Sequence, residues 1–341
     1  MAVAMKANRL RAMLEECGTL IADGAMGTML FEAGLEFGDP PELWNVERPE
    51  SVNAIQSAYI QAGAQLLLTN TFGSSRFRLG QHGLQERTHE LSRAGAANLR
   101  STIDAVGSTA LVAGDIGPSG EIMEPLGELD FEDAVAGFAE QCGGLVAGGV
   151  DVIWIETMSS AEEMAAAVQG VRQVDLEIPI VACMSFDTHG RTMMGVTPED
   201  AVQQMLDLGV FAVGGNCGLG TAEMLQVIER MHAVAPEAAL VAKSNAGVPE
   251  LEGGKAVYRA KPQAMAEFAL AARARGARII GGCCGTRPEH ISAMAAALAE
   301  QAPPAEIKRR APIDVAEGAA DSGHIAARVQ RRRRRRRRKN G

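Results

Sequence analysis

The sequence predicts an α/β protein folded as a (β/α)8 barrel of the TIM type, and three observations support this prediction. Eight short runs are nearly continuous in Val, Ile, Leu and Ala, as expected of parallel strands buried on both faces. Ala-rich stretches with apolar residues at helical spacing separate most of these runs. Eight strand–helix units within about 290 residues match the size of a closed barrel. The alternative is an open doubly wound sheet, but no GxGxxG motif follows the first run.

The predicted strands, in chain order, are 19–24, 65–72, 110–117, 151–157, 178–186, 210–218, 239–247 and 277–285. Between them, helical spacing is clearest at 161–171, 198–207 and 221–232. Most of the runs end in a polar residue, Gly or Cys. The carboxyl ends of the strands form the catalytic face of a TIM barrel. We therefore expect one site lined by Asp23, Asn70, Asp115, Glu156, Ser185, Cys217, Asn245, Cys283 and Cys284.

Charge and composition divide the chain into a barrel domain at 1–302 and a tail at 303–341. The net charge is −9, but residues 328–341 hold nine Arg and one Lys, which leaves −19 on residues 1–327. A block of like charges repels itself and buries nothing, so we expect the Pro/Ala-rich and then Arg-rich tail to be disordered. Such a tail is either a solvated extension or a contact for RNA, acidic lipid or an acidic protein. The acidic body disfavours nucleic acid as the main ligand.

The composition predicts a soluble, cytoplasmic protein with no membrane association. No apolar stretch approaches the ~18 residues that a membrane helix needs. The N-terminus becomes charged too early for a signal peptide. In a reducing compartment the six cysteines are not expected to form disulfides. The sequence leaves open whether the chain forms a homo-oligomer.

Three of the six cysteines lie in glycine-flanked segments at predicted strand ends. Cys217 belongs to GGNCG, and Cys283 and Cys284 belong to GGCCG. Three thiolates suit zinc, and a zinc ion with three protein ligands keeps its fourth position for water or substrate. A soft thiolate is the best occupant of that position, which points to alkyl transfer onto a substrate thiol. The alternative is that Cys217, Cys283 and Cys284 are three buried thiols without a metal. We interpret the other three cysteines, Cys17, Cys142 and Cys183, as core or surface thiols.

These segments resemble the homocysteine S-methyltransferase family. That family includes betaine–homocysteine methyltransferases, S-methylmethionine-dependent enzymes and the homocysteine module of cobalamin-dependent methionine synthase. The resemblance runs over residues 14–301 and is carried by ADGAMGT (22–28), AGAQLLLTNTF (62–72), GDIGPSGE (114–121), IET in the fourth run, GGNCG (214–218) and IIGGCCGTRPEHI (279–291). It implies a TIM barrel in which Cys217, Cys283 and Cys284 bind Zn²⁺, with the sulfur of homocysteine as the fourth ligand.

The resemblance also implies that Asp23 and Glu156 bind the ammonium group of homocysteine. Two carboxylates at strand ends could neutralise an amine and orient it. The alternatives are a turn residue for Asp23 and a helix-start acid for Glu156. Backbone N–H groups of Gly24, Ala25 and Met26, at a predicted helix start, are expected to hold the substrate carboxylate.

Two positions of the sequence, Trp44 and Gly73, bear on the methyl donor. Trp44 matches a Trp of the betaine and S-methylmethionine branches, where its ring would face an onium methyl group, or else it only packs in the first loop. Gly73 stands where animal betaine enzymes carry Tyr, and TNTF looks more like methionine synthase.

We expect zinc-dependent methyl transfer from a small onium donor, most simply betaine giving dimethylglycine, to homocysteine, forming methionine. One alternative is the homocysteine-activating subunit of a split methionine synthase, which needs a separate corrinoid protein because no folate- or cobalamin-binding domain is recognisable. Others are a non-catalytic zinc- or thiol-binding protein, and a Schiff-base enzyme using Lys243, which could instead pair with an acid.

Overall fold

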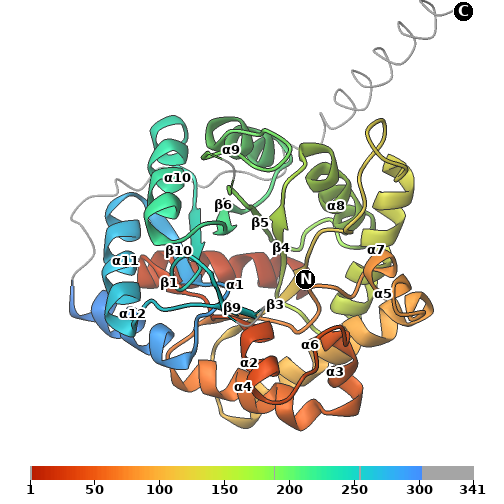
Figure 1. The fold of residues 1–341 in the computed structure, drawn as a ribbon, viewed down its shortest axis with the longest axis horizontal. Coiled ribbons are helices and arrows are strands. Elements are labelled where there is room, and N and C mark those ends of the chain that lie inside the picture. Colours follow the sequence, from red (N-terminus) through yellow and green to blue (C-terminus); the bar gives the residue numbers. More distant parts are fainter. Residues whose placement is uncertain (1, 188, 253–254, 302–341) are drawn as a thin grey trace, which may run out of the picture.

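Parallel strands form the wall of a barrel in the computed structural model, which describes residues 2–187, 189–252 and 255–301 (Figure 1). Those strands are β1 (Leu20–Ile21), β2 (Leu66–Leu68), β3 (Leu111–Ile116), β4 (Val152–Met158), β5 (Ile180–Met184), β6 (Ala212–Cys217), β7 (Leu240–Ser244) and β10 (Ala277–Gly282). Their order in the sheet is β1-β10-β7-β6-β5-β4-β3-β2. A parallel bridge between Ala22 and Leu66 joins the two ends of this order. The predicted TIM barrel is confirmed, and the open doubly wound sheet is wrong.

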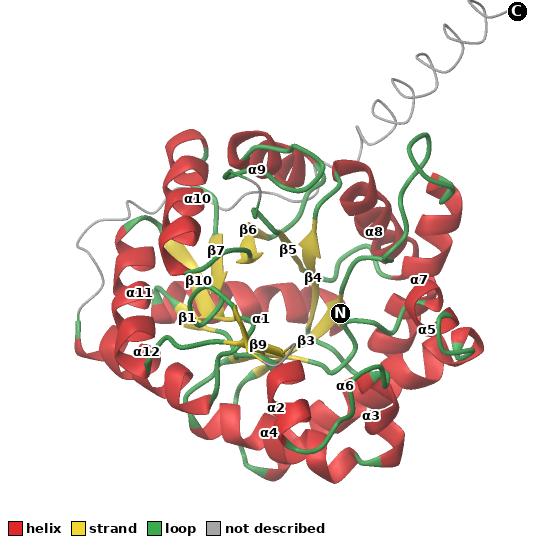
Figure 2. Cartoon of the chain, viewed as in Figure 1, coloured by secondary structure: helices red, strands yellow, loops and turns green. Residues whose placement is uncertain are grey.

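The first helix crosses the barrel behind the strands, and the other helices form a ring outside them (Figure 2). In chain order the helices are α1 (Ala2–Cys17), α2 (Met26–Glu32), η1 (Pro41–Leu43), α3 (Trp44–Glu47), α4 (Pro49–Gln61), α5 (Arg76–Gly80), η2 (Gln85–Arg87), α6 (Thr88–Ala105), α7 (Phe131–Ala147), α8 (Ala161–Val174), α9 (Pro198–Asp207), α10 (Thr221–Val234), α11 (Pro262–Ala274) and α12 (Pro288–Glu300). Helices α5, α7, α8 and α9 begin at a capping side chain, since Ser75, Asp130, Ser160 and Thr197 each accept a hydrogen bond from a first-turn N–H. A short hairpin, β8 (Glu250–Glu252) and β9 (Lys255–Val257), lies between β7 and α11.

Alternate residues of each strand face the barrel interior, as the period of two requires. The interior is filled by small and branched side chains and by Trp154, with Leu10 and Leu14 of α1 packed into the same cluster. The opposite faces of the strands pack against the outer helices. Toward the carboxyl ends of the strands, the residues that face the interior become charged. Two positions after the apolar Ala113, Trp154 and Val241 come Asp115, Glu156 and Lys243.

None of the helices in the described part of the chain is both long and apolar enough to cross a membrane. The predicted tail at 303–341 lies outside the described residues, as does the proposed domain boundary at 302. Both stay predictions.

Candidate metal and substrate site

The structure brings Cys217, Cys283 and Cys284 together at the carboxyl ends of the strands. Their sulfur atoms all lie within 4.8 Å of one another, and the Sγ atoms of Cys217 and Cys284 are 3.9 Å apart. Cys217 ends β6 with a left-handed backbone (φ 60°), a conformation that an L-residue rarely adopts. Cys283 and Cys284 follow β10 in a turn that Thr286 closes by donating its hydroxyl proton to the carbonyl of Cys283, at 2.6 Å. Across residues 2–187, 189–252 and 255–301, this is the one cluster of three Cys, His or acidic side chains close enough to share a metal ion.

Asn216 and Asn245 hold this cluster in place. The Asn216 amide exchanges two 2.7 Å hydrogen bonds with Thr157 at the end of β4 and lies 3.8 Å from the Cys283 sulfur. The Asn245 amide donates to the carbonyl of Gly218 at 2.7 Å, while its buried Oδ1 has no hydrogen-bond partner among the described residues. A buried oxygen left without a donor beside three soft thiols fits a cation, and three sulfur ligands fit zinc. The three thiols and the neighbouring Asn245 oxygen therefore fit the predicted zinc ion.

Hydrogen bonds within the cluster make the three thiols unequal. The S–H groups of Cys283 and Cys284 lower the pKa of Cys217 to about 3. The same contacts with Cys217 raise the pKa of Cys283 to about 11. These shifts favour a thiolate on Cys217 over one on Cys283 in the metal-free protein.

We expect iodoacetamide to alkylate Cys217 first when the protein is metal-free. Because its pKa is lowered, Cys217 keeps its thiolate as the pH falls from 8 to 6, whereas ordinary thiols become protonated. Buried Cys142, whose pKa burial raises to about 12, should react slowly at both pH values. Peptide mapping by mass spectrometry measures the order of modification, with free glutathione as the pH-dependent reference thiol. Equal slowing of glutathione and Cys217 at pH 6 would contradict the unequal charge.

Asp23 and Glu156 lie together beneath this site, and Lys243 lies between them. The Lys243 ammonium is 3.3 Å from Asp23 Oδ1 and 3.6 Å from Glu156 Oε2. The N–H of Leu68 donates to Asp23 Oδ2 at 2.8 Å, and the indole of Trp154 donates to Glu156 Oε2 at 2.9 Å. All three charged groups are buried.

Burial raises the pKa of Glu156 to about 7 and also raises the pKa of Asp23, against the lowering effect of Lys243. Burial disfavours the charge on Lys243, but Glu156 and Asp23 outweigh it and raise the pKa of this lysine. A Schiff-base lysine needs a neutral amine. The structure therefore supports the pairing of Lys243 with acids and opposes the Schiff-base alternative.

The predicted carboxylate contacts at Gly24, Ala25 and Met26 lie in the turn between β1 and α2. The Ala25 N–H already donates to Thr286, at 3.1 Å from its hydroxyl oxygen. The Tyr59 hydroxyl lies 3.1 Å from the carbonyls of both Ala25 and Thr286. Thr286 and Tyr59 thus fix the turn, and of the three predicted amides those of Gly24 and Met26 are the candidates that remain.

Trp44 is buried, and the guanidinium of Arg48 lies 4.8 Å from the centre of its ring. A cation of the chain itself therefore occupies a face of this ring, which favours the packing interpretation over an onium contact. Gly73 lies close to another buried acid, because its N–H donates to Glu42 Oε1 at 2.7 Å and an added Cβ would fall 2.8 Å from that oxygen. A side chain at position 73 would therefore displace Glu42.

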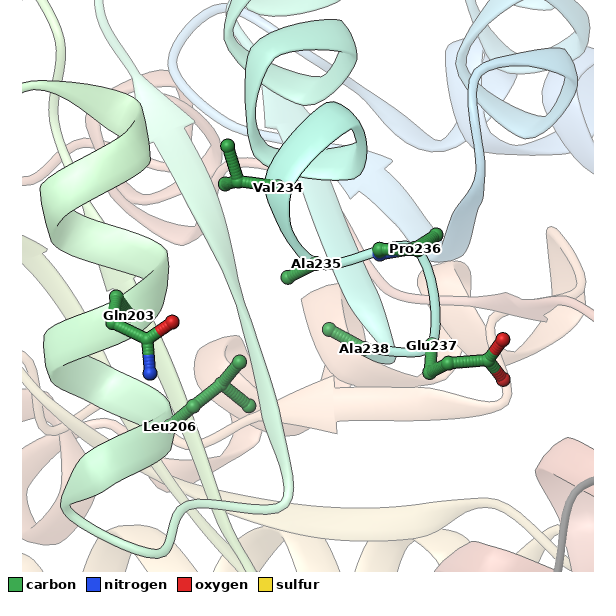
Figure 3. A pocket seen from close by; sticks show the side chains of 7 residues that line it. All are labelled: Gln203, Leu206, Val234, Ala235, Pro236, Glu237 and Ala238. Atoms are coloured by element: carbon green, nitrogen blue, oxygen red, sulfur yellow. The ribbon is translucent and has the colours of Figure 1, made fainter.

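A separate apolar hollow of about 250 Å³ lies between the ends of α9 and α10 (Figure 3). It is lined by Gln203, Leu206, Val234, Ala235, Pro236, Glu237 and Ala238. Because helices run antiparallel to the strands in this fold, the carboxyl ends of these helices lie at the face opposite the cysteines. The hollow is therefore not part of the candidate site.

Comparison with known proteins agrees with this geometry. The family model described as homocysteine S-methyltransferase matches residues 20–298. The methionine synthases of Mycobacterium tuberculosis (strain ATCC 25618 / H37Rv) and Mycobacterium leprae (strain TN) are 34% and 32% identical to this chain over 296 residues. Each match covers 82% of this chain and 24% of the relative, so the chain spans about a quarter of the length of these relatives.

Solved structures give the same result. The metallated form of the homocysteine methyltransferase MmuM from Escherichia coli is similar with a TM-score of 0.71 and 25% identity, over 84% of this chain and 99% of that chain. The oxidized form of the same protein has a TM-score of 0.70 and 26% identity. Together with the three cysteines at the mouth of the barrel, these matches show that the chain belongs to the homocysteine S-methyltransferase family.

Proposed function

We propose that the chain catalyses zinc-dependent transfer of a methyl group to homocysteine, forming methionine. The observation that carries this proposal is the cluster of three cysteine sulfurs within 4.8 Å at the same barrel mouth as Asp23 and Glu156. Cys217, Cys283 and Cys284 would hold Zn²⁺, which supplies a Lewis acid that keeps the substrate thiol deprotonated. A reducing, cytoplasmic setting would keep the three cysteines unoxidised.

The chain's own residues bind and orient the substrate in this proposal. Asp23 and Glu156 accept hydrogen bonds from the ammonium group, and the turn at Gly24 and Met26 receives the carboxylate at the start of α2. With both ends held, the sulfur is aimed at the donor's methyl carbon. The new S–C bond forms as the bond between that carbon and the donor breaks, and the donor keeps the bonding electrons. No general base is required once the thiol proton is gone.

A small onium compound such as betaine, giving dimethylglycine, is our proposed donor. The support is that a barrel of this size makes up nearly the whole solved chain of the E. coli homocysteine methyltransferase, since the match covers 99% of that chain. A single barrel that binds homocysteine needs a donor small enough to enter the same barrel mouth. The second candidate donor is a methylated corrinoid on a separate protein. It is favoured by the names of the curated relatives and by the quarter of their length that this chain spans.

Methionine formation from homocysteine tests the proposal, using reduced, zinc-loaded protein with betaine, S-methylmethionine or methylcobalamin as the sole donor. We expect turnover with betaine. If methionine forms with methylcobalamin but with neither other donor, betaine is wrong and the methylated corrinoid is the donor. Tight homocysteine binding without methionine from any donor would overturn the enzyme and leave a zinc- and thiol-binding protein.

A further inference from the structure

The barrel interior ends in a charged layer that contains one more acid than the predicted substrate pair. Asp115 lies two residues beyond Ala113 on β3, and its register partner on β4 is Trp154, the indole that binds Glu156. The side chain of Asp115 therefore follows the interior face of the strand into the layer that holds Glu156 and Lys243. Charge interactions of Asp115 with both of these groups agree with this placement.

Lys243 already uses part of the acceptor capacity of the predicted pair. It forms ion pairs with Asp23 Oδ1 and Glu156 Oε2. In addition, the Leu68 N–H donates a hydrogen bond to Asp23, and the Trp154 indole donates one to Glu156. An ammonium group brings three N–H donors and one positive charge. Two carboxylates that share one lysine retain one unit of negative charge, which balances the charge of the ammonium group. Each of the two can accept one of the three N–H donors, so a third acceptor oxygen would complete the subsite.

Asp115 offers such an acceptor, because one of its carboxylate oxygens accepts no hydrogen bond among the described residues. The residue is only 6% exposed, yet its Oδ1 has no hydrogen-bond partner within the described part of the chain. Its backbone, by contrast, is fixed: the N–H donates to Thr69 Oγ1 at 2.9 Å, and the carbonyl accepts from Thr71 Oγ1 at 2.7 Å. A rigidly held, buried and unpartnered carboxylate oxygen lowers stability unless a ligand uses it.

We propose that Asp115 is a substrate-binding residue whose Oδ1 accepts the third hydrogen bond of the homocysteine ammonium, making the site specific for α-amino thiols. This inference rests on the proposed function. In it, Lys243 offsets one of the three carboxylates and the substrate supplies a second positive charge to the same layer. Burial and the neighbouring Glu156 raise the pKa of Asp115, as expected where positive charge is lacking before substrate binds.

The test compares homocysteine with 4-mercaptobutanoate, the same thiol without its amino group. Binding of both to the zinc-loaded full chain is measured by calorimetry for the natural protein and for Asp115→Asn. We expect Asp115→Asn to weaken homocysteine binding about ten- to a hundredfold, the range for a hydrogen bond to a charged group. Binding of 4-mercaptobutanoate should change less than about threefold. The melting temperature should stay the same or rise, because a buried unpaired carboxylate is removed.

Glu163→Gln is the matched control, because Glu163 is a buried acid that Ser119 binds outside the charged layer. It should leave the ratio of the two affinities unchanged. Equal weakening of both ligands by Asp115→Asn, or unchanged homocysteine binding, would overturn the role of Asp115. Should Asp115→Asn fail to fold, Asp115→Ser answers the same question. Since the readout is binding, it decides about Asp115 even if no donor yields methionine, which is the outcome that defeats the proposed enzyme.

Discussion

Cys217→Ala is expected to lose both bound zinc and methionine formation. Removing one of three thiolates leaves two sulfur ligands, too few for a zinc site of this type. The zinc content should fall from about one ion per chain to below about a tenth, and turnover should fall roughly a thousandfold or more, since an unactivated thiol is a weak nucleophile at neutral pH. Metal analysis by mass spectrometry and a methionine assay on the same preparation measure the two losses.

Cys17→Ala is the control for this experiment, because Cys17 is an exposed cysteine at the end of α1. It should keep full zinc content and activity. The melting temperature of Cys217→Ala in the presence of chelator should match that of the chelated natural protein, which separates metal loss from misfolding. Full activity of Cys217→Ala without metal would defeat the zinc mechanism.

Gly214→Ala, in GGNCG, is expected to have the largest effect on stability. Gly214 pairs with Val241 of β7, and an added Cβ would fall 2.0 Å from the Val241 carbonyl oxygen, a backbone atom that cannot turn aside. Strands β6 and β7 would have to separate. We expect a loss of about 3 kcal/mol or more in the free energy of unfolding, seen as a melting temperature lower by roughly 5 °C or more.

Gly27→Ala is the matched control for that substitution. Gly27 lies inside α2, and an added Cβ there meets nothing within 4 Å among the described residues. Because alanine favours a helix more than glycine does, this variant should be stabilised by about 0.5–1 kcal/mol. A Gly214→Ala protein as stable as Gly27→Ala would show that the barrel wall is far more adaptable than its packing indicates.

Hydrophobic periodicity in the sequence predicted the barrel because buried parallel strands need continuous apolar runs. The hairpin β8–β9 escaped prediction, since ELE and KAV are too short and too polar to stand out. The three cysteines were found because glycines mark their turns. The partners of Lys243 were not, because its ion pairs join β7 to residues 220 and 87 positions earlier in the chain. For Trp44, the sequence could not show that Arg48 covers the ring.

The three cysteine sulfurs lie at the ends of strands on either side of β7, because the sheet order there is β10-β7-β6. A metal ion held by them would act as a crosslink between positions 217 and 283, which are 66 residues apart in the chain. In the unfolded chain the same ligands are far apart, so part of the binding free energy goes into bringing them together. The concentration of available metal would then affect stability as well as activity. It would set how often strands β6, β7 and β10 separate and how long the protein resists proteolysis.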